Sequence, residues 1–350
     1  MTERAAPSAE TRERWKRIAM RSLFLLAALV VLYFFLPTIV DFLDSASELA
    51  SVEWWWYVVM ALLMTGAFMS AWELTHIAVP SINRFVAACS QLVSNAMAKV
   101  IPGGAVAAGA TYFQMLSVSG VPTGQAAAAL AAVSFISNLV LFSLPGIALV
   151  IAAASAPIPD GLVPVALVGT VLFIVMFTAV FVVVRWDGPM LFVGRMVEVS
   201  AGWAAKQFKR DWRPTAQGFL DRRNEVVRAL GRRWWKALLA AVANWMLDYM
   251  VLFVALVAVG AEPRASLVLL AFAGGAVLGM IPITPGGLGF VEVGLVALLV
   301  AAGIPGPDAT LATLAYRLYQ FWLPIPAGAI AYVVFRRRYG RPSDLEEAAA

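Results

Sequence analysis

The chain has 350 residues, of which 61% are hydrophobic and only 13% are charged, and its formal net charge is +5. Soluble domains average about 45–50% apolar and 25% charged residues. Together with a mean hydropathy of +0.82, this excludes an ordinary soluble protein and predicts an all-α polytopic membrane protein.

Apolar windows of about 20 residues, the length that crosses a bilayer as a helix, divide the chain into two membrane halves. The first half, 22–184, is predicted to contain helices 22–40, 54–72, 123–154 and 162–184, with a broken apolar segment at 85–118. The second half, 235–335, is predicted to contain helices 235–259 and 309–335, with a broken segment at 266–303.

Most of the 26 Lys and Arg residues lie in the N-terminus 1–21, in the loop 185–234 and in the tail 336–350. The positive-inside rule places all three on the cytoplasmic face, so we expect a multi-pass protein of the cell membrane with both termini cytoplasmic. The excess positive charge is juxtamembrane, and it therefore does not indicate nucleic-acid binding. The loop 185–234 reads either as surface-lying amphipathic helices or as a solvated linker.

The two broken segments share a Pro-Gly-Gly sequence with an offset of 183 residues: Pro102, Gly103 and Gly104 in the first, Pro285, Gly286 and Gly287 in the second. The same offset aligns "GVPTGQA", which starts at residue 120, with "GIPGPDA", which starts at residue 303. The positive-inside orientation makes the helix 54–72 run inward and its counterpart 235–259 run outward. The pattern thus predicts two inverted repeats, an arrangement found in transporters.

Each Pro-Gly-Gly break would leave backbone groups without hydrogen-bond partners in the hydrocarbon region unless protein or a water-filled cavity supplies them. We therefore expect both breaks to line a polar cavity. The arms are short for a full crossing, which favours re-entrant helical hairpins; two kinked full crossings are the alternative.

Ionisable residues inside membrane segments usually face the protein interior or an aqueous cavity. Asn95 and Lys99 are spaced i, i+4, which delivers a cation next to the first break. Asp248 lies in the first long helix of the second half, and Arg317 and Gln320 lie one turn apart in the last helix. These five residues are the predicted headgroup or substrate path, together with Glu292.

Glu292 follows the second break by five residues, near a helix N-terminus whose free N–H groups and dipole suit anions. It has two alternative roles: direct contact with the substrate, or a structural ion pair with Arg317.

The sequence has no phosphate-binding Gly-rich loop, no HExxH motif, no cysteine pair and one histidine. We therefore predict no metal site, no cofactor and no catalytic residues, and hence a protein that is not an enzyme.

The stretches "GMIPITPGGLGFVEVGL" and "GIPGPDATLATLAYRLYQFWLPIPAG" resemble the C-terminal signature of a flippase-like membrane family, UPF0104-like, related to the transmembrane part of lysylphosphatidylglycerol synthases. The resemblance covers about residues 54–335 and implies lipid translocation through a cavity between two repeats. After the first break, many members have Gly-Glu and then Arg, where this chain has Val106, Ala107 and Ala110; Lys99 is then the alternative cation.

The leading hypothesis is a lipid flippase or scramblase that moves an anionic or zwitterionic headgroup, with membrane lipids as its partners. The alternatives are an ion-coupled transporter of a small polar solute and a non-transporting partner of a lipid or glycan synthesis enzyme. The GxxxG of Gly275 and Gly279 indicates close helix packing and is compatible with a homo-oligomer.

Overall fold

The computed structural model describes residues 46–101, 104–155, 159–188, 231–281 and 284–340, and a few positions between 191 and 224. The predicted helix 22–40, the termini 1–21 and 341–350 and most of the loop 185–234 lie outside the described residues, as do Pro102 and Gly103. The described part of the chain is all-helical.

The first half contains a short helix followed by two long helices that flank a broken pair, and then a further long helix. The elements are α2 (Ala46–Ser51), α3 (Trp54–Ala78), α4 (Arg84–Val100), α5 (Gly104–Val118), α6 (Thr123–Ser155), the 3₁₀ turn η1 (Asp160–Leu162) and α7 (Val163–Arg185).

The second half has a similar order, with its last helix interrupted by a wide turn. The elements are η2 (Gly231–Arg233), α10 (Trp234–Ala258), α11 (Ala265–Leu278), the 3₁₀ turn η3 (Pro285–Gly287), α12 (Phe290–Ala301), α13 (Gly306–Arg317), the π-helical turn η4 (Leu318–Trp322) and α14 (Pro324–Tyr339).

Four described helical stretches are long and apolar enough to cross a membrane: Trp54–Ala78, Thr123–Ile151, Trp234–Ala258 and Gly306–Tyr339. The first of these continues past residue 72, where the predicted helix ends. Its extra turns tolerate polar residues because Glu73 pairs with Arg84 at 3.3 Å and the His76 ring hydrogen-bonds the carbonyl of Ile82. Hydropathy windows stop at such residues, whereas a helix does not.

The breaks follow from local backbone rules. Ile101 precedes Pro102 and has an extended backbone, because proline disfavours the helical region for the residue before it, and α4 ends there. In the second break Gly286 has a φ of 58°, a left-handed conformation that glycine adopts readily. Both conformations turn the chain sharply inside an apolar segment.

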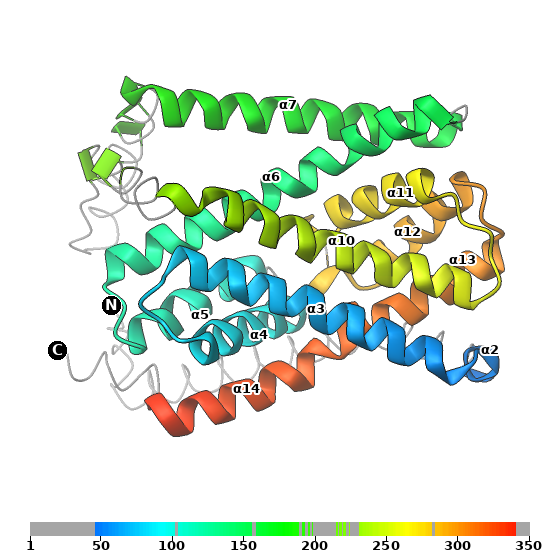
Figure 1. Cartoon of the computed structure of the whole chain (residues 1–350), viewed down its shortest axis with the longest axis horizontal. Coiled ribbons are helices and arrows are strands. Elements are labelled where there is room, and N and C mark those ends of the chain that lie inside the picture. The colour runs from blue at the N-terminus through cyan, green and yellow to red at the C-terminus, as the bar shows by residue number, and fades with distance from the viewer. Residues whose placement is uncertain are drawn as a thin grey trace, which may run out of the picture.

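The helices form an elongated bundle in which α3 and α10 lie along each other at the centre (Figure 1). The α4–α5 pair lies at one end of the bundle and the α11–α12 pair at the other. α4 packs on α14, and α11 packs on α6. The α4–α14 contact is very close: a Cβ added to Gly328 would lie 2.4 Å from the Cβ of Ala96.

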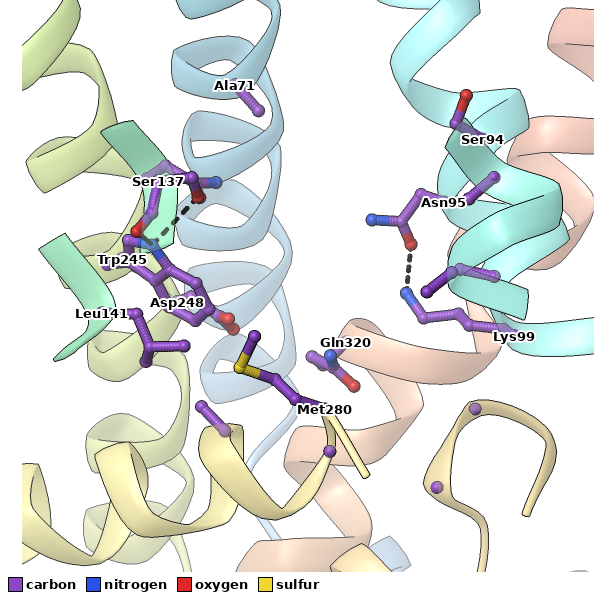
Figure 2. A pocket seen from close by; sticks show the side chains of 18 of the residues that line it. Ala71, Ser94, Asn95, Lys99, Ser137, Leu141, Trp245, Asp248, Met280 and Gln320 are labelled. Atoms are coloured by element: carbon purple, nitrogen blue, oxygen red, sulfur yellow. Dashed lines mark hydrogen bonds between the residues drawn. The ribbon is translucent and has the colours of Figure 1, made fainter. Parts of the chain in front are cut away.

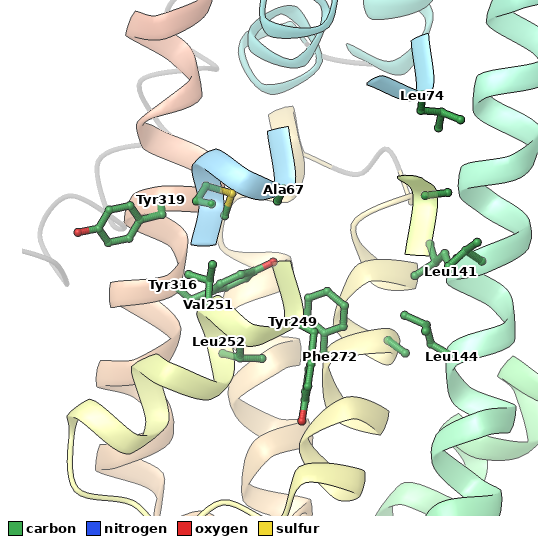
Figure 3. Close-up of a cluster of buried hydrophobic side chains, with 14 of the residues drawn as sticks. Ala67, Leu74, Leu141, Leu144, Tyr249, Val251, Leu252, Phe272, Tyr316 and Tyr319 are labelled. Atoms are coloured by element: carbon green, nitrogen blue, oxygen red, sulfur yellow. The ribbon is translucent and has the colours of Figure 1, made fainter. Parts of the chain in front are cut away.

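The core between α3, α6, α10, α11 and α13 is built from aromatic and aliphatic side chains (Figure 3). The Phe272 ring lies edge-on to Tyr249 at 5.8 Å and to Tyr316 at 6.4 Å, both favourable arrangements of aromatic quadrupoles. The Tyr249 hydroxyl donates to the carbonyl of Ala265 at 2.9 Å. This cluster fixes the walls of the cavity described next.

Candidate functional site

A cavity of about 580 Å³ lies within the bundle, lined by side chains from both halves. That volume is in the range of small-molecule sites, about 300–1,000 Å³. Its lining includes an unusual number of polar groups for an apolar bundle, among them Gln91, Asn95, Lys99, Asn138, Asp248 and Arg317.

Lys99 lies at the end of α4, is 7% exposed and lines the cavity. Its ammonium donates to the side-chain oxygen of Asn95, one turn earlier on the same helix (Figure 2). No carboxylate of the described residues forms an ion pair with it. Burying an unpaired charge is costly, so this cation indicates a polar, functional space rather than a packing element.

Arg317 closes α13 and is 4% exposed. Its Nε donates to Glu292 Oε1 at 2.7 Å, its Nη1 to Gln320 Oε1 at 2.9 Å and its Nη2 to the carbonyl oxygen of Gly286 at 3.3 Å. The guanidinium also lies over the Phe321 ring at 4.7 Å. Arg317 therefore stabilises the second break from the side of the last helix.

The π-helical turn η4 begins immediately after Arg317 and contains Gln320. Its wider backbone loop, closed by a bond from the Leu323 N–H to the Leu318 carbonyl, is followed at once by Pro324, which has no N–H to continue the helical bonding. Such turns are rare in helices and are frequent at functional sites.

The two breaks meet inside the bundle. η3 packs on α4, and a Cβ built on Gly286 would lie 3.0 Å from the Cα of Lys99. The tip of the second hairpin therefore rests on the backbone of the residue that carries the cation of the first.

Asp248 faces the cavity from α10, and its Oδ1 accepts a hydrogen bond from the Tyr316 hydroxyl at 3.1 Å. Its second oxygen accepts no hydrogen bond from the described residues. Figure 2 places Asp248 and Trp245 on one side of the cavity and Asn95 and Lys99 on the other.

The cavity brings together five of the six predicted path residues: Lys99, Asn95, Asp248, Arg317 and Gln320. The sixth, Glu292, lies behind Arg317 as its ion-pair partner and is not among the lining residues. Its Oε2 is buried and has no hydrogen-bond partner among the described residues.

Among the predicted break residues, Gly104, Gly286 and Gly287 line the cavity. Pro285 is buried but is not among the lining residues. Pro102 and Gly103 lie outside the described residues.

Sequence reasoning missed three polar residues of this region. Tyr316 positions Asp248, Ser94 lines the cavity with a buried hydroxyl that has no partner in the described structure, and Thr75 accepts from Gln91 at 2.9 Å and from Tyr112 at 3.2 Å. Ser94 and Tyr316 directly precede the predicted residues Asn95 and Arg317, so their positions in the sequence could have indicated them. Nothing in the sequence pointed to Thr75.

Residues 22–328 match the family described as the lysylphosphatidylglycerol synthase TM region. The chain belongs to this family. Two UPF0104 membrane proteins of Methanothermobacter thermautotrophicus are similar to it, one 31% identical over 90 residues and the other 32% identical over 98. The matches cover 26% and 28% of this chain and only 27% and 28% of those relatives.

Proposed function

We propose that this membrane protein is a lipid translocase of the flippase or scramblase type, which moves a polar headgroup through the central cavity while the acyl chains stay in the bilayer. The observation that carries the proposal is the cavity itself: a space lined by Lys99, Asp248 and Arg317 inside an apolar bundle, at the point where two broken hairpins meet. Intramembrane charges of this kind mark substrate pathways.

Re-entrance of the hairpins is part of the proposal. At 1.5 Å per residue, helices α4 and α5 are about 26 and 23 Å long, and α11 and α12 about 21 and 18 Å, all shorter than a hydrocarbon core of about 30 Å. The two pairs lie at opposite ends of the bundle in Figure 1, which is the position expected of hairpins that enter from opposite faces. Broken helices that meet at the midplane are where transporters bind their substrates.

The inverted repeat is also supported by the packing. Helix α6 begins at Thr123 and α13 at Gly306, which is again an offset of 183 residues. In each half the first arm of the hairpin packs on the long helical stretch that follows the hairpin of the other half: α4 on α14, and α11 on α6. A pseudo-two-fold relation between the halves accounts for both contacts.

We place the protein in the cell membrane, with the loop 185–234 and both termini on the cytoplasmic side, from the distribution of basic residues. A lipid or glycan synthesis enzyme is a proposed source of its substrate, and no catalysis by this chain is proposed.

Reconstitution into liposomes that contain a fluorescent phospholipid tests the function directly. The expected result is dithionite-accessible lipid in excess of that in protein-free vesicles, with a decrease in rate for Lys99→Gln. Lys236→Gln is the matched control, because Lys236 is an exposed lysine at the start of α10, remote from the cavity lining. Rates equal to those of empty vesicles across anionic and zwitterionic lipids would overturn the proposal.

A further inference from the structure

The cavity is lined by one lysine and one aspartate that form no ion pair with any described residue. Arg317 lines it as well, but that charge is neutralised by Glu292 at 2.7 Å behind the wall. Lys99 and Asp248 remain, and they form no ion pair with each other although both face the same space. An unpaired cation opposite an unpaired anion is the charge pattern that a dipolar ligand would complete.

The basic side of the cavity is formed by α4 and offers hydrogen-bond donors. The side-chain oxygen of Asn95 accepts a hydrogen bond from Lys99, so its amide N–H groups are directed elsewhere and make no hydrogen bond to the described residues. An ammonium and an amide one turn apart on one helix suit a phosphate group.

The acidic side has a different chemistry. Asp248 Oδ1 is held by Tyr316 at 3.1 Å, which leaves the other oxygen as an acceptor facing the cavity. Three aromatic rings line the same cavity: Phe272 lies 6.2 Å from Trp245 and 6.4 Å from Tyr316, edge-on to both, and Tyr316 is the residue that donates to Asp248. A carboxylate among aromatic faces is suited to an ammonium group, which gains from both the charge and the ring quadrupoles.

We infer that the cavity binds a zwitterionic phosphate–ammonium group in a fixed orientation, with the phosphate on Asn95 and Lys99 and the ammonium on Asp248 beside the Trp245, Phe272 and Tyr316 rings. The chemistry is that of a phosphoethanolamine group. That a lipid carries this group rests on the proposed function. The binding of the group itself does not depend on transport.

Binding to the purified full-length protein in detergent tests the inference, with calorimetric titration of two short-chain lipids that share their acyl chains. Dihexanoyl phosphatidylethanolamine should bind more tightly than dihexanoyl phosphatidylglycerol, which lacks the ammonium. Lys99→Gln should weaken both lipids. Asp248→Asn should weaken only the phosphatidylethanolamine, by about tenfold to a hundredfold, the loss expected for one charge-assisted hydrogen bond.

The control for Asp248→Asn is Glu262→Gln, which removes an exposed carboxylate from the connection between α10 and α11 and should change neither affinity. Asp248→Glu keeps the negative charge and should keep the preference for phosphatidylethanolamine. This second variant tests the same charge if Asp248→Asn folds poorly. Equal affinities for the two lipids in the unaltered protein, or an equal loss for both in Asp248→Asn, would overturn the inference.

Two further measurements separate this inference from the proposed function. Soluble glycerophosphoethanolamine, titrated alone, should bind with the same dependence on Asp248 but more weakly, because it lacks acyl chains. If it binds as tightly as the lipid and no lipid is translocated in liposomes, the zwitterion site stands and the translocase proposal fails. If lipids are translocated without headgroup preference, the function stands and the zwitterion site fails.

Discussion

The two breaks of the bundle are built in different ways. The second is cross-linked: Arg317 binds the Gly286 carbonyl and Glu292 together, and Gly286, Gly287 and Gly289 all have positive φ. The first has no such ion pair among the described residues, since an offset of 183 residues puts Ser134 opposite Arg317 and Gly109 opposite Glu292. In the described part of the chain its cation, Lys99, donates a hydrogen bond to Asn95 and forms no ion pair. One break is a fixed support, and the other presents an available cation.

The largest effect is expected when one partner of the buried Arg317–Glu292 pair at the second break is removed. Glu292→Gln or Arg317→Gln should each lower the free energy of unfolding by about 3–5 kcal/mol, because a buried charge loses its partner. The double variant should recover part of that loss. Thermal unfolding in detergent micelles measures the effect, and Arg84→Gln, in the exposed Arg84–Glu73 pair, should cost less than about 1 kcal/mol. Equal costs for the two pairs would contradict the supporting role of the second break.

Alanine substitutions at the breaks compare their backbones. Gly286→Ala should cost about 2–4 kcal/mol, since a side chain there is strained at a φ of 58° and would lie 2.3 Å from the Phe321 ring. Gly104→Ala should cost about 1–3 kcal/mol, because its Cβ would lie 2.2 Å from the carbonyl oxygen of Ala98 in the neighbouring helix. Gly306→Ala, at a position with open space, serves as the control in the same unfolding assay. If Gly306→Ala lowered the free energy of unfolding as much as Gly104→Ala does, steric contact at the breaks would not be the cause of the destabilisation.

Two buried tyrosine hydroxyls give a finer comparison. Tyr316→Phe removes a hydrogen bond to the Asp248 carboxylate and should cost about 1.5–3 kcal/mol, whereas Tyr112→Phe removes one to the Thr75 hydroxyl and should cost about 0.5–1.5 kcal/mol. Unfolding midpoints of the two variants side by side decide the order. The reverse order would mean that Asp248 does not depend on Tyr316.

Lys99→Gln should have the smallest effect on unfolding and yet a clear effect on transport. Removal of a buried cation without an ion-pair partner relieves a desolvation cost, so the unfolding midpoint should not fall. Lipid translocation in proteoliposomes should decrease in the same variant. A drop in stability comparable to that of Arg317→Gln would place Lys99 in the structural support instead of the path.

Much of this organisation could be predicted from local sequence. Apolar windows predicted an all-α membrane protein, and the described residues are all-helical; the i, i+4 spacing placed Asn95 and Lys99 on one face, where they form a hydrogen bond. The Pro-Gly-Gly sequences located both interruptions, because backbone dihedrals and missing N–H groups are local properties.

The remaining features depend on packing between distant segments. Helical periodicity indicates which face a residue occupies but not what lies opposite it, so neither the Tyr316–Asp248 bond nor the position of Glu292 behind the cavity wall could be derived. The π-helical turn after Arg317 was equally hidden, although the prolines at 324 and 326 mark the end of regular bonding there. Gln320, within this turn, accepts a hydrogen bond from the Arg317 guanidinium at 2.9 Å.

The contact of Gly286 with the backbone of Lys99 also has an electrical consequence. If the hairpins enter from opposite faces, this contact lies between the two aqueous sides, and part of the membrane potential falls across it. Moving one elementary charge through such a field involves about 2.3 kcal/mol per 100 mV. A bound group with one charge of each sign carries no net charge through it, so its passage would be electroneutral and its rate insensitive to voltage.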